Sequence, residues 1–515
     1  MKSYSLINNI VGWIVFAAAS LVYLFTMEPT VSFWDCGEFI SAAYKLQVVH
    51  PPGAPMFLMI GRLFTMFASG PEDVAYMMNA LSAYSSSFCV LFLFWTITAI
   101  AKKIMITRSE SPDLGNVIAV MGAGVVGAMS CCFADSIWFS AVEGEVYALS
   151  SFFTALVVWA IFKWENQADG PLANRWLVFI AFMMGISIGV HLLNLLTIPA
   201  LAFVYYHKKH KFSPIGFIVT GVVSVLILGF IQVGVIQKIP ELITAFELFF
   251  TNTLGMPFNS GSFAVVVLLI SIVVGGVYWT HQSKDKINSE SNYLYQFGID
   301  AKNINVAILC LGMIFIGYSA YFMVVIRSMA NPAIDMNNPQ EPYNLLSYLQ
   351  REQYGSSPIL YGHYYTAQQS GKKEVGEKYY QDQNEDGDDE YFFKSTKYEP
   401  TYEGKMGFFP RMHSAQDKHK RAYRNIINPT FEVHDYNGNM LKKFKKIKSA
   451  KAYVQSNPGQ GLRIVDQFSF LDNLYFFFEY QIGWMYHRYF MWNFSGRQND
   501  MQGHSSNTEG NWITG

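Results

Sequence analysis

Two carboxylates stand three residues apart just after the first apolar segment of the chain. They are Asp35 and Glu38 in "FWDCGEF" (33–39). If this stretch is helical, both side chains lie on one side of the helix. A carboxylate at the edge of a membrane is costly unless it is solvated or paired, which favours a functional role. The aromatic neighbours are expected to surround Asp35 with apolar surface and to suit it to general-base chemistry. In the structural alternative, Glu38 solvates a helix that re-enters the membrane and pairs with Lys45.

The segment "HPPGAP" (50–55) follows these acids. Each proline fixes its own φ and restricts the residue before it, so the segment predicts a rigid extended turn. His50 is left open between a residue of the site and a turn residue at the membrane interface.

Two further polar clusters lie where spans begin or bend. Glu143, Glu145 and Tyr147 belong to "EGEVYAL", at the start of a span. The helix dipole favours an acid at such an end and explains one glutamate better than two. His191 and Asn194 are three residues apart among leucines, which indicates either ligands or the more frequent helix–helix hydrogen bond.

Arg327 closes another apolar segment at the end expected to emerge outside. An arginine at a helix end commonly extends its charged head into water. Because few arginines are expected on that side, binding of an anion such as a lipid phosphate is the functional alternative.

The elements that must position these residues are membrane spans. The chain is 51% hydrophobic, and Lys, Arg, Asp and Glu together number 32 in residues 1–326 but 43 in residues 327–515. A span needs roughly 20 mostly apolar residues. Seven stretches meet this requirement: 8–26, 76–101, 116–134, 144–163, 214–236, 263–281 and 303–326. The stretch 176–206 predicts two short helices that meet at a bend, and 55–69 a helix on the membrane surface, which gives nine crossings.

The basic residues predict which side each loop occupies, because cytoplasmic loops collect Lys and Arg. With the N-terminus inside, the outer loops before residue 327 hold only Lys45, Arg62 and Lys238. All the candidate site residues then fall on the outer side. The lysine and apolar run at the N-terminus are interpreted as a retained first helix, because no cleavage site of small residues follows.

The predicted fold class is therefore mainly α: a polytopic transmembrane helical bundle of about nine spans, followed by a mixed extracytoplasmic soluble region. The predicted domains are 1–326, a transmembrane catalytic domain; 327–466, the soluble region; and 467–515, an aromatic segment at the membrane interface with the C-terminal end.

Several classes of function are disfavoured. A net charge of -1 argues against nucleic acid. The five cysteines (36, 89, 131, 132 and 310) form neither a disulfide framework nor a CxxC metal site. The acidic run at 382–390 has the first offsets of a calcium loop but Phe393 at the twelfth position, which favours a solvated turn. The basic run at 441–453 is interpreted as a solvated edge. Transporters usually contain paired internal repeats, and none is seen in this sequence, which disfavours a transporter.

An outer carboxylate beside many spans fits chemistry on a lipid-borne substrate. If a sugar is carried on a lipid phosphate, the leaving phosphate needs a cation nearby and the acceptor hydroxyl must lose its proton to a carboxylate. Arg327 and Asp35 are the candidates for these two roles.

The chain resembles the GT-C class of polytopic, polyprenyl-phosphate-dependent glycosyltransferases. It is identified more closely as a member of the DUF2723 family, bacterial relatives of a eukaryotic membrane protein O-mannosyltransferase. The motifs that carry the resemblance run from residue 34 to 500: "WDCGEFI", "HPPGAP", "AVEGEVYAL", "GVHLLNLL", "RSMANPAIDMNNP", "YLQREQYG" and "YFMWNFSGRQND".

The resemblance implies transfer of a sugar, with mannose expected, from a polyprenyl phosphate to Ser or Thr of exported proteins. The expected partners are this donor lipid, the protein acceptor and membrane lipid. The expected location is the bacterial cytoplasmic membrane, with the site facing the periplasm. By analogy Asp35 is the catalytic base with Glu38 beside it, and no cofactor is expected, while a need for a divalent cation is left open. Substrate-binding roles are predicted for His50, Glu143, Glu145, Tyr147, His191, Asn194 and Arg327, and no metal ligands are assigned.

Two alternatives remain at this point. One is a GT-C transferase that acts on a lipid or glycan acceptor, and the other is a non-enzymatic membrane transport or scaffold protein. Members of the family are often longer, so the chain is expected to be either a shortened member or part of a longer protein.

Overall fold

The computed structural model describes residues 2–105, 113–289, 300–499, 501 and 508–512. These residues form two compact units. The first, unit 1, comprises Met1–Gln353 with Tyr379–Phe392, and the second, unit 2, comprises Tyr354–Lys378 with Phe393–Gly515.

Unit 1 is built almost entirely from helices. Its α-helices are α1 (Lys2–Thr26), α2 (Cys36–Lys45), α3 (Pro55–Thr65), α4 (Val74–Met105), α5 (Leu114–Cys132), α6 (Asp135–Ala141), α7 (Val146–Gln167), α8 (Asn174–Ile188), α9 (Ile198–Lys209), α10 (Pro214–Gly229), α11 (Lys238–Leu248), α12 (Ser260–Gln282), α13 (Lys284–Ile287), α15 (Ala301–Tyr318), α16 (Phe322–Ser328) and α17 (Pro342–Leu349).

Short 3₁₀ and π segments connect or extend these helices. The 3₁₀ segments of the chain are η1 (Pro71–Asp73), η2 (Leu192–Thr197), η5 (Ser319–Tyr321) and η6 (Glu352–Tyr354). The π segments are η3 (Phe230–Val235), η4 (Phe249–Thr253) and η7 (Phe476–His487).

Seven helical runs in the described part of the chain are long and apolar enough to cross a membrane, so the chain is a multi-pass membrane protein. They are Tyr4–Thr26, Pro71–Met105, Leu114–Cys132, Val146–Gln167, Pro214–Thr253, Ser260–Gln282 and Ala301–Ser328. Each contains or overlaps one of the seven long stretches predicted from the sequence. The stretch 176–206 does divide into two helices, but α8 has 15 residues and α9 has 12. Because a crossing needs roughly 20 residues, the predicted total of nine is not confirmed.

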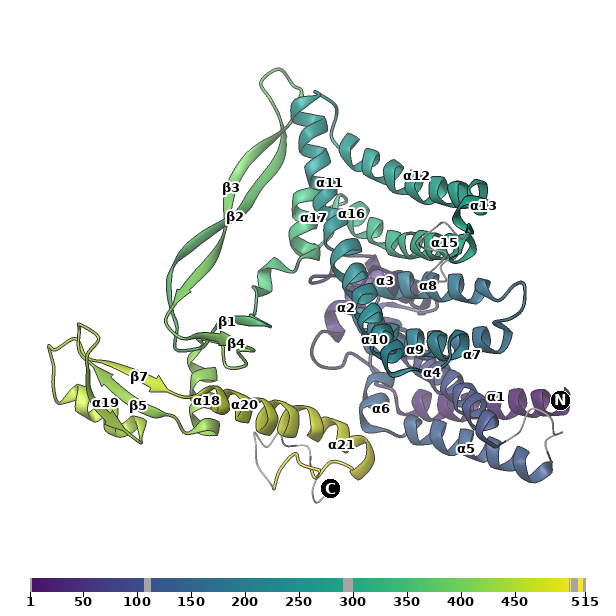
Figure 1. Cartoon of the computed structure of the whole chain (residues 1–515), viewed down its shortest axis with the longest axis horizontal. Helices are drawn as coiled ribbons and strands as arrows, with labels where there is room; N and C mark the ends of the chain where they lie inside the picture. The colour runs from purple at the N-terminus through teal and green to yellow at the C-terminus, as the bar shows by residue number, and fades with distance from the viewer. Residues whose placement is uncertain (1, 106–112, 290–299, 500, 502–507, 513–515) are drawn as a thin grey trace. The chain divides into compact units, whose positions relative to one another are not determined.

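The long helices of unit 1 pack in series (Figure 1). Helix α4 contacts α1, α5 and α7; α7 contacts α8; α8 contacts α15; and α15 contacts α12. Glycines allow the closest of these contacts. A Cβ atom on Gly317 of α15 would lie 2.4 Å from the carbonyl carbon of Gly185 on α8. The two backbones therefore touch, as small residues permit between membrane helices.

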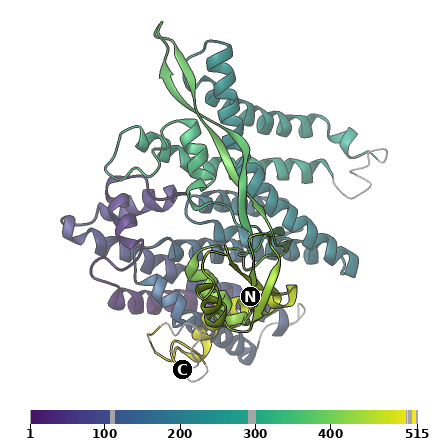
Figure 2. The same ribbon diagram turned by 90° about the vertical axis from the view of Figure 1, so that its left-hand side faces the viewer.

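Strands lie in the polar half of the chain, so the predicted mixed region is confirmed as containing sheets. Strands β1 (Tyr361–His363) and β4 (Met406–Phe408) pair antiparallel, and β2 (Gln368–Gln383) and β3 (Asp389–Glu403) form a long hairpin (Figure 2). A three-stranded antiparallel sheet has the order β6 (Met440–Phe444), β5 (Thr430–His434), β7 (Arg463–Gln467). Besides α17, the α-helices of this half are α18 (Asp417–Ile427), α19 (Ile447–Gln455), α20 (Phe470–Tyr475) and α21 (Arg488–Ser495).

The acidic run of the sequence forms the turn of the β2–β3 hairpin. The side-chain oxygen of Asn384 accepts hydrogen bonds from the backbone N–H groups of Asp386 and Asp388, at 3.0 and 2.9 Å. Gly387 has φ +84°, a conformation that favours glycine. The run is thus a turn that satisfies its own backbone, as predicted.

The aromatic segment predicted to lie at the membrane interface is helical from Phe470 to Ser495, through α20, η7 and α21. Leu471, Tyr475 and Phe478 are exposed at the spacing of one helix face. Membrane contact by this face stays a prediction.

Candidate active site

The first carboxylate of the site lies at the start of a short helix. Asp35 is the N-cap of α2, but its side chain makes no capping hydrogen bond and is exposed. Trp34, immediately before it, has φ +60°, a conformation that is strained for a bulky side chain. Phe33 and Trp34 are 82% and 85% exposed. The expectation that these two residues cover Asp35 with apolar surface is therefore wrong.

Glu38 and His50 form a close pair one turn further along α2. One carboxylate oxygen of Glu38 accepts the backbone N–H of His50 at 2.7 Å, and the other lies 2.8 Å from its Nδ1. The alternative pairing of Glu38 with Lys45 is not the one observed. Burial raises the pKa of Glu38, but the two hydrogen bonds from His50 outweigh it and leave the pKa below its ordinary value. The hydrogen bond to Glu38 raises the pKa of His50, against the opposing effect of burial. His50 thus belongs with Asp35 and Glu38, and these three residues together with Glu143 and Glu145 are called the acid cluster below.

Loop contacts hold His50 in place. The Val48 N–H donates to the carbonyl of Ile334 at 3.0 Å, and the buried Tyr348 hydroxyl donates to the carbonyl of Val49. Gly53 has φ +76°, and a Cβ atom there would lie 2.4 Å from the Tyr348 hydroxyl. The sequence predicted a rigid turn here but gave no role to Tyr348, which lies 299 residues from Val49.

A second acid pair comes from the turn between α6 and α7. Glu145 is the N-cap of α7, and its carboxylate accepts the N–H of Val146 at 3.1 Å. Glu143 accepts a hydrogen bond from Ser32 at 2.9 Å and another from the thiol of Cys36. Both glutamates are buried. The helix dipole of α7 accounts for Glu145, whereas Glu143 is held by Ser32 and Cys36 at the start of α2.

The two acid pairs act on one another electrostatically. Burial, with a smaller contribution from the carboxylates of Asp35 and Glu143, raises the pKa of Glu145 to about 7 despite the hydrogen bond from Val146. Burial and the charges of Glu143 and Glu145 raise the pKa of the Cys36 thiol to about 12. The carboxylates of Glu38, Asp35 and Glu145 thus all act on the His50 imidazole.

Gly144 permits the close approach of this turn to α2 and α4. A Cβ atom on Gly144 would lie 3.0 Å from Ile40 and 3.1 Å from the side-chain oxygen of Asn79. Asn79 is fully buried and donates to the carbonyls of Glu28 and Thr30. Its oxygen has no hydrogen-bond partner among the described residues. Sequence reasoning missed this asparagine because nothing local distinguishes it within an apolar helix.

His191 and Asn194, the predicted pair among leucines, have different surroundings in the structure. The rings of His191 and Tyr147 lie 5.3 Å apart, and Tyr147 is two residues from Glu145. Burial lowers the pKa of His191. Asn194 is fully buried and donates to the hydroxyl of Ser187 at 2.7 Å. Asn194 therefore makes the internal hydrogen bond of the structural alternative, whereas Tyr147 and His191 adjoin the acids.

Arg327 lies at the opposite end of α2. Its Nε donates to the carbonyl of Leu46 at 2.6 Å and an Nη to the carbonyl of Lys45 at 3.1 Å. These carbonyls would otherwise lack partners at a helix end. The guanidinium thus fixes α2, and binding of a donor phosphate by Arg327 stays a prediction.

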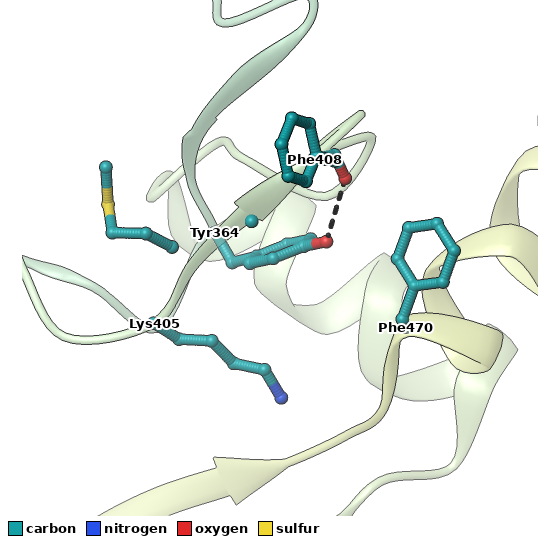
Figure 3. A pocket seen from close by; sticks show the side chains of 6 residues that line it. Tyr364, Lys405, Phe408 and Phe470 are labelled. Atoms are coloured by element: carbon teal, nitrogen blue, oxygen red, sulfur yellow. Dashed lines mark hydrogen bonds between the residues drawn. The ribbon is translucent and has the colours of Figure 1, made fainter.

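Unit 2 contains a pocket of a different kind, of about 280 Å³ (Figure 3). Its lining is mainly aromatic and apolar, and the amine of Lys405 donates to the backbone carbonyl of Phe468. The Tyr364 hydroxyl donates to the carbonyl of Phe408 at 3.3 Å. This pocket offers surface for contact but no acid–base pair.

Comparison with known proteins relates the chain to protein O-mannosyltransferases. Residues 35–213 match the family described as Protein O-mannosyl-transferase TMEM260 N-terminal domain, and residues 355–478 match a family of unknown function, DUF8416. The mouse Protein O-mannosyl-transferase TMEM260 is 28% identical over 175 residues, which cover 34% of this chain and 22% of the relative. The Dictyostelium discoideum Protein O-mannosyl-transferase tmem260 is 25% identical over 197 residues, which cover 36% of this chain and 22% of the relative.

The matched segment begins at Asp35 and contains every predicted site residue except Arg327. The alignments span about a fifth of the length of the curated relatives. The narrower assignment to DUF2723 stays a prediction.

Proposed function

We propose that the chain is a glycosyltransferase that moves a sugar, with mannose expected, from a polyprenyl phosphate to a Ser or Thr hydroxyl of an exported protein. The observation that carries the proposal is the acid cluster around α2, which lies within the segment similar to protein O-mannosyltransferases. The distribution of basic residues supports an outer site, which in a bacterium faces the periplasm.

Asp35 is the proposed general base. In the transfer, the acceptor oxygen forms a bond to the anomeric carbon while the bond from that carbon to the phosphate oxygen breaks. The hydroxyl proton passes to Asp35, and the polyprenyl phosphate leaves with the bonding electrons. Asp35 suits this role because its carboxylate is exposed and makes no capping hydrogen bond. A positioned base of this kind contributes roughly 10²–10⁴-fold to a rate.

The remaining polar residues are proposed to bind and orient substrate. Glu38 orients His50 through two hydrogen bonds, and the pair stands beside Asp35. Tyr147 and His191 offer ring faces against which a sugar can lie, and Glu143 and Glu145 offer hydrogen-bond acceptors for its hydroxyl groups.

The test is transfer by the full chain purified in detergent. It is supplied with polyprenyl-phosphate-mannose and a Ser/Thr-rich peptide, and the peptide mass is measured. The proposal expects the gain of one hexose, and no gain on a matched peptide with Ala at every Ser and Thr. Transfer to an added lipid or glycan acceptor, with none to the peptide, would refute the protein acceptor. No transfer to any acceptor would contradict the transferase.

A further inference from the structure

Three side chains of the acid cluster can contact one small ion together. Asp35, Glu38 and His50 each offer one ligand atom, and these atoms all lie within 4.8 Å of one another. It is the only such group of three or more among the residues that the structure describes. Two come from the first turn of α2 and the third from the turn at 50–53, so the group is assembled by the fold.

The spacing fits coordination to a metal. Bonds of about 2.1 Å at right angles place two ligand atoms about 3 Å apart, and opposite ligands about 4.2 Å apart. Glu38 and His50 are already separated by 2.8 Å. A cation can therefore replace the proton between them with little movement, and Asp35 needs to shift by less than about 1 Å.

The charge of the site also calls for a cation. Among the described residues, none of Asp35, Glu38, Glu143 and Glu145 forms an ion pair with Lys or Arg. Arg327, the one arginine predicted to supply positive charge, binds backbone carbonyls at the far end of α2.

We propose that Asp35, Glu38 and His50 bind a divalent cation of the Mn²⁺ or Zn²⁺ type. Carboxylates suit Mn²⁺, imidazole suits Zn²⁺, and a mixed set accepts either. One oxygen of Asp35 binds the cation, and the other remains free for the proton of the acceptor hydroxyl. The cation supplies the positive charge that the leaving phosphate needs. This last role rests on the proposed function, whereas binding of the ion does not.

The binding test uses Mn²⁺ and the full chain in detergent, purified with a tag that lacks histidine and treated with EDTA. Loss of the electron paramagnetic resonance signal of free Mn²⁺ measures the bound ion. We expect one ion per chain. Because each variant removes a ligand, Glu38→Gln and His50→Gln are each expected to weaken binding at least tenfold, while Asp135→Asn, an exposed acid on α6, leaves it unchanged.

A spectroscopic test needs no comparison of affinities. Mn²⁺ bound to His50 gives a nitrogen modulation in electron spin-echo spectra, which is expected in the wild type and absent in His50→Gln. Absence of stoichiometric Mn²⁺ binding, or a nitrogen modulation that persists in a folded His50→Gln protein, would overturn the proposal.

Failure of this proposal and failure of the proposed function are distinguishable. Mn²⁺ binding without transfer to any acceptor would refute the transferase and leave the metal site standing. Transfer that continues at full rate in EDTA, with no Mn²⁺ bound, would refute the metal site alone.

Discussion

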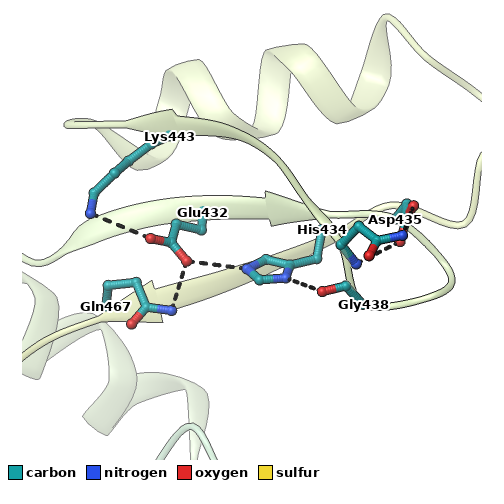
Figure 4. A network of polar contacts seen from close by, with 7 residues as sticks. Glu432, His434, Asp435, Gly438, Lys443 and Gln467 are labelled. Atoms are coloured by element: carbon teal, nitrogen blue, oxygen red, sulfur yellow. Dashed lines mark hydrogen bonds and ion pairs between the residues drawn. The ribbon is translucent and has the colours of Figure 1, made fainter.

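Each of the two units contains a carboxylate–histidine pair, and the surroundings of the two pairs differ. In unit 2, Glu432 lies 3.2 Å from the Nε2 of His434, 3.3 Å from the amine of Lys443 and 2.9 Å from the amide of Gln467 (Figure 4). The other ring nitrogen of His434 lies 2.9 Å from the carbonyl of Gly438. Every charge and both ring nitrogens therefore have partners.

In unit 1, Glu38 and His50 are closer, at 2.8 Å, yet their surroundings are not balanced. Asp35, Glu143 and Glu145 add negative charge, and no described residue faces the Nε2 of His50 with a hydrogen bond. A carboxylate–imidazole pair on a sheet can thus be purely structural. Uncompensated charge, more than the pair itself, therefore marks the candidate site.

The largest expected effect of the unbalanced charge in unit 1 is on the pH dependence of protein stability. Burial raises the pKa of Glu145 from 4.5 to about 7. The folded protein therefore holds a proton that the unfolded chain has lost, and stability falls as pH rises from about 4.5 to about 7. The effect is up to about 3 kcal/mol, and the charged groups that act on it are Asp35, Glu143 and His50.

Glu145→Gln should remove this decline, because the amide carries no charge at any pH. Unfolding of both proteins in EDTA between pH 4 and 8 measures it. If the free energy of unfolding changes with pH in the same way in wild type and variant, burial of Glu145 does not cause the decline.

A matched pair of substitutions compares the two carboxylates directly. Glu38→Gln should lower the transfer rate 10- to 100-fold, about 1.4–2.7 kcal/mol, because His50 loses its orienting partner. Glu432→Gln should leave the rate unchanged and lower the stability of unit 2 by about 1 kcal/mol. Equal loss of rate in the two variants would remove the distinction between them.

Arg327→Gln tests whether the guanidinium acts on α2 or on the donor. Loss of its bonds to Leu46 and Lys45 should lower the free energy of unfolding by about 1–2 kcal/mol and reduce kcat, with the KM for the donor unchanged. A higher donor KM with unchanged stability would place the guanidinium at the donor phosphate instead.

Tyr348→Phe has the smallest expected effect. It removes only the hydroxyl that donates to the carbonyl of Val49, at a cost of about 1 kcal/mol, and a modest loss of rate should accompany it because the turn before His50 loosens. Thermal unfolding and transfer assays measure both. A loss larger than that of Glu38→Gln would give Tyr348 a direct role at the substrate.

Local patterns predicted much of the fold because spans depend on contiguous apolar residues. The stretch 76–101 corresponds to α4 and 263–281 to α12, each within a few residues. The bend within 176–206 was also foreseen from its glycines and His191.

The contacts of the site could not be predicted in the same way. The carboxylate of Glu38 pairs with His50, twelve residues on, and Arg327 binds the end of α2 from 281 residues away. Such contacts depend on how the helices pack, and no local periodicity encodes them. Residue type nonetheless indicated the acids, because a charge beside a membrane must have a partner or a function.

The role of Asp35 as the base is tested by comparing the transfer rates of Asp35→Asn and Asp135→Asn, both confirmed as folded by their melting temperatures. Each variant removes one exposed acid near a helix start, but only Asp35 belongs to the acid cluster. We expect a loss of kcat of roughly 10²–10⁴-fold for Asp35→Asn and no loss for Asp135→Asn. Equal rates in the two variants would show that Asp35 is not the base.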